Sequence, residues 1–267
     1  MSSVMRKLAL ALALIMVFGM VPNVHAASPQ ARAIDIFRID GTDVTLARSF
    51  GGRQVAPRAG QRLSEGNEIT TRWDTQVYFS LDADSIIKMD ESTQVVVGSA
   101  RERLVLTVQS GAVLVAVVDQ AAHHSLETRI GNTVIGVRGT HYFMRRLADD
   151  VVTITMLSGL GVVDFVDEFG RVTSVPLNMG YMMQVFDRHD PAAAAGVVVG
   201  FQSYVLMPID FSLLTLFELV EMLALLPDLE YELQPYIDRR ITEREAQRQL
   251  VLEREARNQI GRIAHFE

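Results

Sequence analysis

Apolar and polar residues alternate along much of the first two thirds of this 267-residue chain. In TQVYFSL (75–81), for example, Val77, Phe79 and Leu81 fall at every second position, and VTITM (152–156) repeats the pattern. This period of two, with many β-branched residues, is typical of half-buried strands. Strands must pair with neighbours and bury one face, so the pattern indicates sheets rather than a helical bundle.

Turn-forming residues separate these strands at intervals of roughly 8–12 residues. The turn signals include SEGN at 64–67, SGA at 110–112, SGLG at 158–161 and NMG at 178–180. Strands and turns at this spacing indicate a sandwich, a barrel or a solenoid. No run between 60 and 186 shows a helical period of 3.6. The sequence therefore predicts a mainly β domain over 27–190.

The N-terminus has the order of a secretory signal peptide. Arg6 and Lys7 precede an apolar run at 8–20, and small residues follow up to Ala26. The apolar run is short for a membrane span, which needs about 20 residues. We therefore expect residues 1–26 to be a signal peptide that directs the chain to the periplasm. An uncleaved anchor is the alternative.

Composition narrows the possible partners. The chain has no cysteine, so we expect neither disulfides nor a lipid attached to cysteine. Signal cleavage would lower the formal net charge from −7 to −9, because it removes Arg6 and Lys7 and no acidic residue. Nucleic-acid binding depends on neutralising phosphates, so an acidic chain is a poor candidate for it.

The character of the chain changes after DPAAAAG. Residues 191–209 are predicted as an apolar linker that could form a strand or a helix, and 210–267 as a helical region. Within this region, 210–227 is apolar apart from one narrow polar stripe. A second helix, over 237–266, interleaves arginine and glutamate and is typical of a solvated face.

The apolar surface of 210–227 allows two arrangements. It could pack on the β domain, or it could form a contact face for a partner protein or a second copy. The candidate partner face consists of Phe211, Leu214, Phe217, Val220 and Leu223. Glu218 and Glu221 lie near the centre of the segment and argue against a membrane span.

No set of residues combines the parts of a catalytic site. The sequence lacks a cysteine nucleophile, a G-x-S-x-G motif and a glycine-rich phosphate loop. His123 and His124 are adjacent, so on a strand they would point to opposite faces and could not share a metal. LDADS at 81–85 lacks the glycine and the distal glutamate of a calcium loop. We therefore expect a non-enzymatic protein without metal or cofactor.

The segment TVIGVRGTHYF at 133–143 is typical of two strands joined by a sharp break. Its central residues are Gly136, Val137, Arg138, Gly139 and Thr140. Two glycines allow the chain to turn a corner. Arg138 could tie loop carbonyls or a carboxylate together, or it could bind an anion. The motif contains no second cation, which favours the structural role.

VIGVRGTHYFM resembles the most characteristic motif of FecR-domain proteins, a periplasmic sensor domain named after the regulator of ferric-citrate uptake. Further segments resemble the family in the same order, at 63–81, 82–97, 104–117, 152–163 and 175–185. The resemblance covers about 45–186. Asn67 stands where the family usually has aspartate, and Leu160 with Gly161 shifts the last glycine pattern; both departures affect turn geometry.

The resemblance implies short strands wound in a solenoid-like way. In the best-known members the domain follows a cytoplasmic anti-sigma segment and a membrane helix, and it receives a signal from an outer-membrane transporter. Here a signal peptide leads into the β domain, so we expect a stand-alone exported form that binds another envelope protein or itself. The alternative is a module that binds a glycan or small ligand through an exposed face with Trp73, Tyr78 and Tyr142.

Overall fold

The computed structural model describes residues 34–263, apart from 50, 83–84, 101–102, 118–124, 138, 147–150, 168, 188–195 and 200–201. The predicted signal peptide, 1–26, lies outside the described residues. All described residues belong to one compact unit. The expectation of a mainly β protein with a helical C-terminal region is confirmed.

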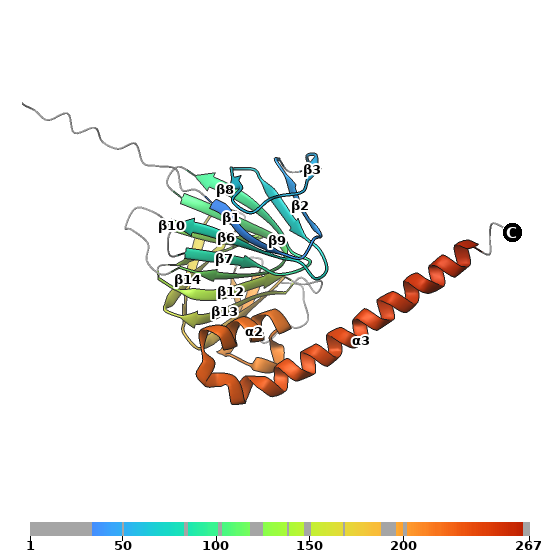
Figure 1. The fold of residues 1–267 in the computed structure, drawn as a ribbon. Coiled ribbons are helices and arrows are strands. Elements are labelled where there is room, and N and C mark those ends of the chain that lie inside the picture. Colours follow the sequence, from blue (N-terminus) through green and yellow to red (C-terminus); the bar gives the residue numbers. More distant parts are fainter. Residues whose placement is uncertain are drawn as a thin grey trace, which may run out of the picture. The chain divides into compact units, whose positions relative to one another are not determined.

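Eighteen strands are present in the part of the chain that the structure describes (Figure 1). They are β1 (Ile34–Asp40), β2 (Val44–Ala47), β3 (Gln54–Val55), β4 (Arg62–Leu63), β5 (Glu68–Thr71), β6 (Gln76–Asp82), β7 (Ser85–Met89), β8 (Gln94–Ala100), β9 (Arg103–Ala116), β10 (Ser125–Ile130), β11 (Thr133–Val137), β12 (His141–Arg146), β13 (Val152–Ser158), β14 (Leu160–Val166), β15 (Val172–Asn178), β16 (Tyr181–Asp187), β17 (Val197–Val199) and β18 (Gln202–Pro208).

These strands form two sheets that share β9. Sheet A has the order β4-β1-β6-β7-β9-β12-β13-β16-β18-β17. Sheet B has the order β3-β2-β5-β8-β9-β10-β11-β14-β15. Neighbouring strands run antiparallel except β9 and β10. Hairpins occur in both sheets: β6–β7 and β12–β13 lie in sheet A, and β8–β9, β10–β11 and β14–β15 lie in sheet B.

The long strand β9 crosses from one sheet to the other at Gly111. Its first half pairs with β8 and β10 in sheet B, and its second half pairs with β7 and β12 in sheet A. Gly111 has a φ of +86°, and a Cβ built on it would lie 2.5 Å from the Cα of Thr93. Only glycine fits this position. The segment 110–112 was predicted as a turn, which is wrong, because the chain continues as a strand through the crossing.

One core lies between the sheets. Sheet A contributes residues such as Phe79, Tyr142 and Ile154, and sheet B contributes residues such as Leu106 and Val163; all are fully buried or nearly so. Because these positions alternate along each strand, the period-two pattern is the direct cause of the two-sheet packing. The finer expectation of a solenoid stays a prediction.

Beyond the β domain the chain differs from the expected boundaries. Within the predicted linker 191–209, β17 and β18 extend sheet A, and β18 pairs with β16 along its whole length. The expected helix at 210–227 is divided into η2 (Phe211–Leu213), α2 (Leu216–Leu225) and η3 (Pro227–Leu229). The break before α2 is explained by Thr215, which is extended and caps the helix in a capping box with Glu218.

The last helix, α3 (Glu230–Ile263), begins earlier than the expected 237. Pro235 lies within its second turn, near the N-terminal end, where few helical hydrogen bonds are lost. No helix among the described residues is both long and apolar enough to span a membrane.

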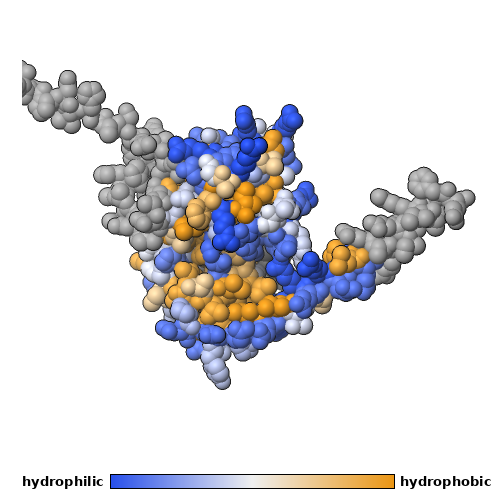
Figure 2. All heavy atoms as spheres, viewed as in Figure 1, coloured by the Kyte–Doolittle hydropathy of each residue, from blue (hydrophilic) through white to orange (hydrophobic). Residues whose placement is uncertain are grey.

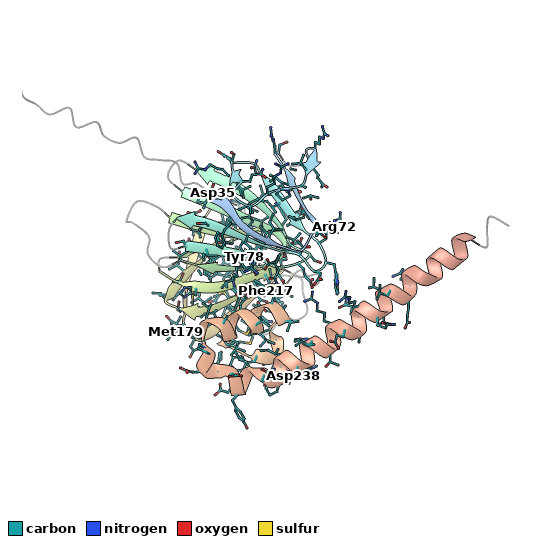
Figure 3. All side chains as sticks on the ribbon, in the orientation of Figure 1. Asp35, Arg72, Tyr78, Met179, Phe217 and Asp238 are labelled. Carbon is teal, nitrogen blue, oxygen red and sulfur yellow. The ribbon has the colours of Figure 1, made fainter. Side chains whose placement is uncertain are left out.

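The helices cover the outer face of sheet A. A second apolar cluster joins Leu114, Phe143 and Leu157 of that face to Leu219 of α2 and Leu233 of α3. Phe217 lies between α2 and the sheet, and its ring meets that of Phe143 edge-on at 6.0 Å (Figure 3). Figure 2 shows apolar side chains gathered on the surface around α2 and, further on, on α3. Strands β12 and β13 are therefore buried on both faces.

Candidate functional site

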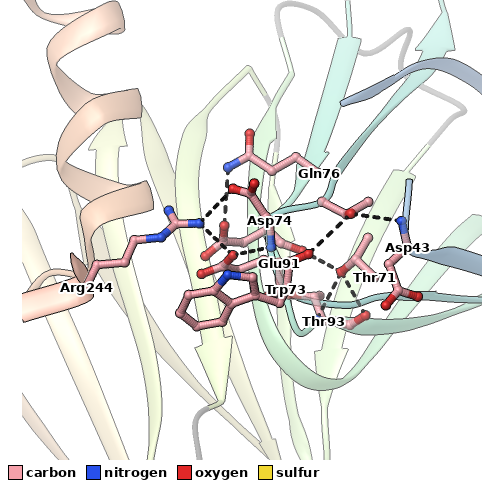
Figure 4. A network of polar contacts seen from close by, with 10 residues as sticks. Asp43, Thr71, Trp73, Asp74, Gln76, Glu91, Thr93 and Arg244 are labelled. Atoms are coloured by element: carbon pink, nitrogen blue, oxygen red, sulfur yellow. Dashed lines mark hydrogen bonds and ion pairs between the residues drawn. The ribbon is translucent and has the colours of Figure 1, made fainter. Parts of the chain in front are cut away.

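Two neighbouring turns, one between β5 and β6 and one between β7 and β8, form the base of the candidate site (Figure 4). Buried threonines hold them together. Thr71 donates from its hydroxyl to the carbonyl of Asp90 at 2.6 Å and accepts from the amide of Thr93 at 3.0 Å. Thr93 donates to the carbonyl of Glu91 at 3.0 Å. Because these hydroxyls satisfy buried backbone groups, the turns are held in one conformation.

Both turns contain a residue in the left-handed region. Asp74 has a φ of +60° and Ser92 a φ of +52°, and they are the two non-glycine residues with positive φ in the described chain. Such conformations are uncommon for side chains other than glycine and persist where the surroundings enforce them. The amide of Asp74 donates to Oε2 of Glu91 at 2.7 Å, which ties one turn to the other.

Arg244 of α3 completes this arrangement. Its Nη2 lies 2.8 Å from Oε2 of Glu91 and 3.2 Å from Oδ1 of Asp74. Its Cζ lies 5.3 Å from the centre of the Trp73 ring. The guanidinium therefore meets two carboxylates and an indole. We call the group of Trp73, Asp74 and Glu91 the guanidinium notch.

A cleft of about 800 Å³ adjoins the notch. The β domain lines it with Trp73, Gln76, Asp90, Glu91 and Ser92, and the helical segment lines it with residues that include Phe217, Val220, Glu221, Arg240, Glu243, Arg244 and Gln247. Most of these residues are polar or charged, and Trp73, Phe217 and Val220 add apolar surface. A concave site of this size is a candidate for ligand or partner binding.

Asp90 is the most perturbed carboxyl of the cleft. Its pKa is raised from 3.8 to about 7. Burial is the main cause and the charge of Glu91 adds to it, while hydrogen bonds from the Glu91 backbone and from Gln76, and the charge of Arg244, oppose the shift. Nε2 of Gln76 lies 3.3 Å from Oδ1 of Asp90. Asp90 therefore changes charge near neutral pH.

Two ion pairs attach α2 to sheet A beside the cleft. Arg145 of β12 pairs with Glu218, and its Nη2 donates to the carbonyl of Leu213 at 2.7 Å. Both side chains of this pair are buried, with exposed fractions of 7% and 0%. Lys88 of β7 pairs with Glu221 in a more open position, where the fractions are 27% and 10%. The first pair is thus the buried attachment and the second a peripheral one.

His141 and Ser158 form a second polar contact, away from the cleft residues. Nδ1 of His141 lies 2.7 Å from Oγ of Ser158, which also accepts from the His141 amide at 3.0 Å. Burial lowers the pKa of His141. The pairing register of β12 and β13 shifts between His141 and Tyr142, so the contact stabilises an irregular strand pair. Within the described ranges, no group of three or more His, Asp or Glu side chains could hold a metal ion.

The residues of the predicted glycine motif lie apart from the cleft residues. Gly136 lies within the regular ladder of β11, paired with Glu127 and Val162, and Gly139 has a φ of +60°. Arg138 and the side chain of Val137 lie outside the described residues, and Thr140 is buried. The structural role of Arg138 stays a prediction.

The five residues of the predicted partner face do not form one exposed surface. Leu214 and Phe217 are buried against sheet A, Phe211 and Leu223 are partly buried, and Val220 is 45% exposed. Of the two arrangements considered, the helix therefore packs on the β domain. Its apolar residues face Phe143 and its neighbours, which the strand pattern alone does not reveal.

The predicted aromatic face is wrong for Tyr142. This side chain is fully buried and its hydroxyl lies 2.7 Å from that of Thr128, and burial raises its pKa. Trp73 is 39% exposed, and Tyr78 is partly buried between Arg38 and Lys88. Of the three aromatic residues, only Trp73 lines the cleft.

Comparison with known proteins finds a family match within the β domain. The family described as FecR protein matches residues 67–160. Two crystal structures of a candidate anti-sigma factor from Parabacteroides distasonis, at 1.65 and 2.50 Å resolution, are similar to the chain with a TM-score of 0.42 and 11% sequence identity. The similarity covers 54% of this chain and 60% of theirs. No curated protein matches the chain.

Proposed function

This chain is a FecR-domain protein, and on that basis we propose that it is an exported, non-enzymatic module that works in the periplasm by binding another envelope protein or a second copy of itself. The FecR domain supports a signalling or sensor role. Binding rather than catalysis agrees with this role, because the ion pairs at the cleft hold Glu91, Glu221 and Glu243 in contact with cations.

The observation that carries the proposal is the exposed part of α3. All side chains from 245 to 254 are exposed, and three consecutive ones are large and apolar: Leu250 at 63%, Val251 at 47% and Leu252 at 52%. Consecutive helical residues point about 100° apart. One flat surface cannot cover all three, so they suit a partner that encloses the helix from more than one side.

The test is cross-linking of the full-length chain in living cells. We expect a discrete cross-linked species that is lost in the double variant Leu250→Glu, Leu252→Glu. The matched control, Ala246→Glu with Gln249→Glu, adds the same charge at two exposed positions of the same helix segment that do not line the cleft, and it should keep the species. If no discrete species forms, or if both double variants lose it equally, the proposed function is wrong.

Export is tested separately by cell fractionation and N-terminal sequencing. We expect the mature chain in the periplasmic fraction, beginning at Ala27. Retention of full-length protein in the cytoplasm would contradict this part of the proposal.

A second candidate function, binding of a glycan or small ligand, is favoured by Trp73 at the cleft. An exposed indole offers a stacking surface for a sugar ring. Trp73 is the only tryptophan of the chain, so its fluorescence reports on this site alone. Titration with envelope polysaccharides that leaves the emission unchanged would exclude this candidate.

A further inference from the structure

The attachment of α3 to the β domain ends at Arg244. Leu233 and Ile237 are buried against the second apolar cluster. One turn later, Arg240 donates to the carbonyls of Leu214 and Ser212 at 3.0 and 2.8 Å. Arg244 follows in the guanidinium notch, and the side chains from 245 to 254 are all exposed. Among the described residues of α3, Arg244 is therefore the last whose side chain forms an ion pair with the β domain.

The notch has the chemistry of an arginine-binding site. A guanidinium is planar, so it can donate to two carboxylates from its edge while its face lies over an aromatic ring. Arg244 donates from Nη2 to both Glu91 and Asp74, and its Cζ lies 5.3 Å from the centre of the Trp73 ring. A lysine ammonium could reach the carboxylates, but it lacks a planar group that can stack on the indole.

The notch is formed by the β domain without help from α3. The buried threonines and the Asp74–Glu91 hydrogen bond hold the two turns, and both left-handed residues, Asp74 and Ser92, lie in them. Backbone conformations of this kind cluster at binding sites. The receptor half of the contact is thus preorganised, whereas Arg244 is a single flexible side chain.

The contact made by Arg244 is weak enough to be exchanged. Arg244 is 34% exposed, Glu91 20% and Asp74 69%, so water and salt screen both ion pairs. With Arg244 withdrawn, the acidic groups of the cleft and notch are Asp74, Glu91, Glu221, Glu243 and the partly protonated Asp90. The cations beside them are Arg240, Lys88 and Arg239, which pairs with Glu243. This acidic excess favours a basic ligand.

We propose that the guanidinium notch is a receptor site for an arginine side chain of a partner protein, and that Arg244 occupies it within the same chain until the partner replaces it. Replacement would detach α3 from the β domain beyond Arg240. The inference depends on the proposed protein-binding function in one respect: the partner protein of that proposal supplies the arginine that replaces Arg244.

The experiment uses Trp73 as the probe of the full mature chain. L-Arginine ethyl ester is titrated into the wild type and the Arg244→Ala variant while tryptophan fluorescence is recorded. The apparent affinity of a competitor is reduced to the fraction of molecules in which the site is free. We expect a saturable change in Arg244→Ala with an affinity about fivefold higher than in the wild type.

Three comparisons make the result specific. Arg248→Ala removes an exposed arginine one turn further along α3 and should behave like the wild type. L-Lysine ethyl ester should bind Arg244→Ala more weakly than the arginine ester does. Adding Glu91→Gln to Arg244→Ala should abolish the response. If Arg244→Ala proves poorly folded, Arg244→Lys keeps the charge and should show the same gain to a smaller degree.

The inference is overturned if the arginine ester gives no saturable response, if lysine binds equally well, or if Glu91→Gln has no effect. Its failure is distinguishable from that of the proposed function. Arginine binding without any cross-linked partner would contradict the proposed function and leave the notch as a receptor site. A cross-linked partner without arginine binding would contradict the notch alone.

Discussion

The buried ion pair between Arg145 and Glu218 should be the main polar attachment of the helices to the β domain. We consider the substitution Arg145→Met, which replaces the aliphatic stem of the side chain and removes its guanidinium group. The side chain of Glu218 is fully buried. Without Arg145, its remaining described polar contact is the capping hydrogen bond that Oε2 accepts from the Thr215 amide at 2.8 Å. Its other oxygen, Oε1, has no hydrogen-bond partner among the described residues. Removing one partner of such a pair costs about 3–5 kcal/mol.

The expected loss of unfolding free energy is at the upper part of this range. The same substitution also removes the hydrogen bond from Arg145 to the carbonyl of Leu213. Urea unfolding followed by circular dichroism measures the effect. For an m-value of about 3 kcal/mol/M, a loss of this size lowers the midpoint by about 1 M or more.

The double variant Arg145→Met, Glu218→Leu is the decisive comparison. It removes both charges and leaves an apolar contact between the sheet and α2. Replacing both partners of a buried pair by apolar residues is often neutral or stabilising, so the double variant should recover most of the loss. A loss below about 1 kcal/mol in Arg145→Met, or a double variant less stable than the single one, would refute the reasoning.

Three further predictions follow from the same contacts. Lys88→Met should cost less than about 1 kcal/mol in urea unfolding, because its pair with Glu221 is more exposed. Asp90→Asn should stabilise the protein by up to about 4 kcal/mol at alkaline pH, because the raised pKa of Asp90 spans about three pH units. The folded wild type binds the proton more tightly than the unfolded chain, so it loses stability as pH rises from about 4 to about 7. Denaturation over a pH series should therefore show the gain of Asp90→Asn shrinking below about pH 7. Gly111→Ala should lower the free energy of unfolding by about 3 kcal/mol or more, because the residue has a positive φ and the added Cβ would overlap with Thr93. Gly131→Ala also has a positive φ but no atom within 4 Å of the added Cβ, so it should cost only about 1 kcal/mol. Equal losses for the two variants would contradict the steric argument.

The strand content was predictable because period-two patterning is a local property. Val77, Phe79 and Leu81, chosen from alternation alone, are all buried in the core between the sheets. The crossing of β9 was not predictable in the same way. A glycine such as Gly111 in SGA at 110–112 can indicate either a turn or a strand that bends. Only the pairing of β9 with strands of both sheets shows that the chain continues here as one strand.

The candidate site was not predictable because its parts are far apart in the sequence. Arg244 lies 153 residues from Glu91 and 170 from Asp74, and no local pattern connects them. One signal was present in the helix. Glu218 and Glu221 form a narrow acidic stripe on an otherwise apolar segment, and an acidic residue facing a sheet requires a cation there. Arg145 and Lys88, the latter the only lysine after the predicted signal peptide, supply those cations.

The ion pairs between the β domain and the helices join residues inside the family match to residues beyond it. Arg145, Lys88 and the guanidinium notch all lie within 67–160, the part that matches the FecR family, whereas Glu218 and Arg244 lie beyond it. The FecR portion therefore carries one half of each polar attachment, and the helical segment carries the other. The attachments also differ in strength along the helices, from a buried pair under α2 to an exchangeable one at Arg244. A ligand that competes at the notch would therefore release the end of α3 first, because α2 remains held by the buried pair and the apolar cluster.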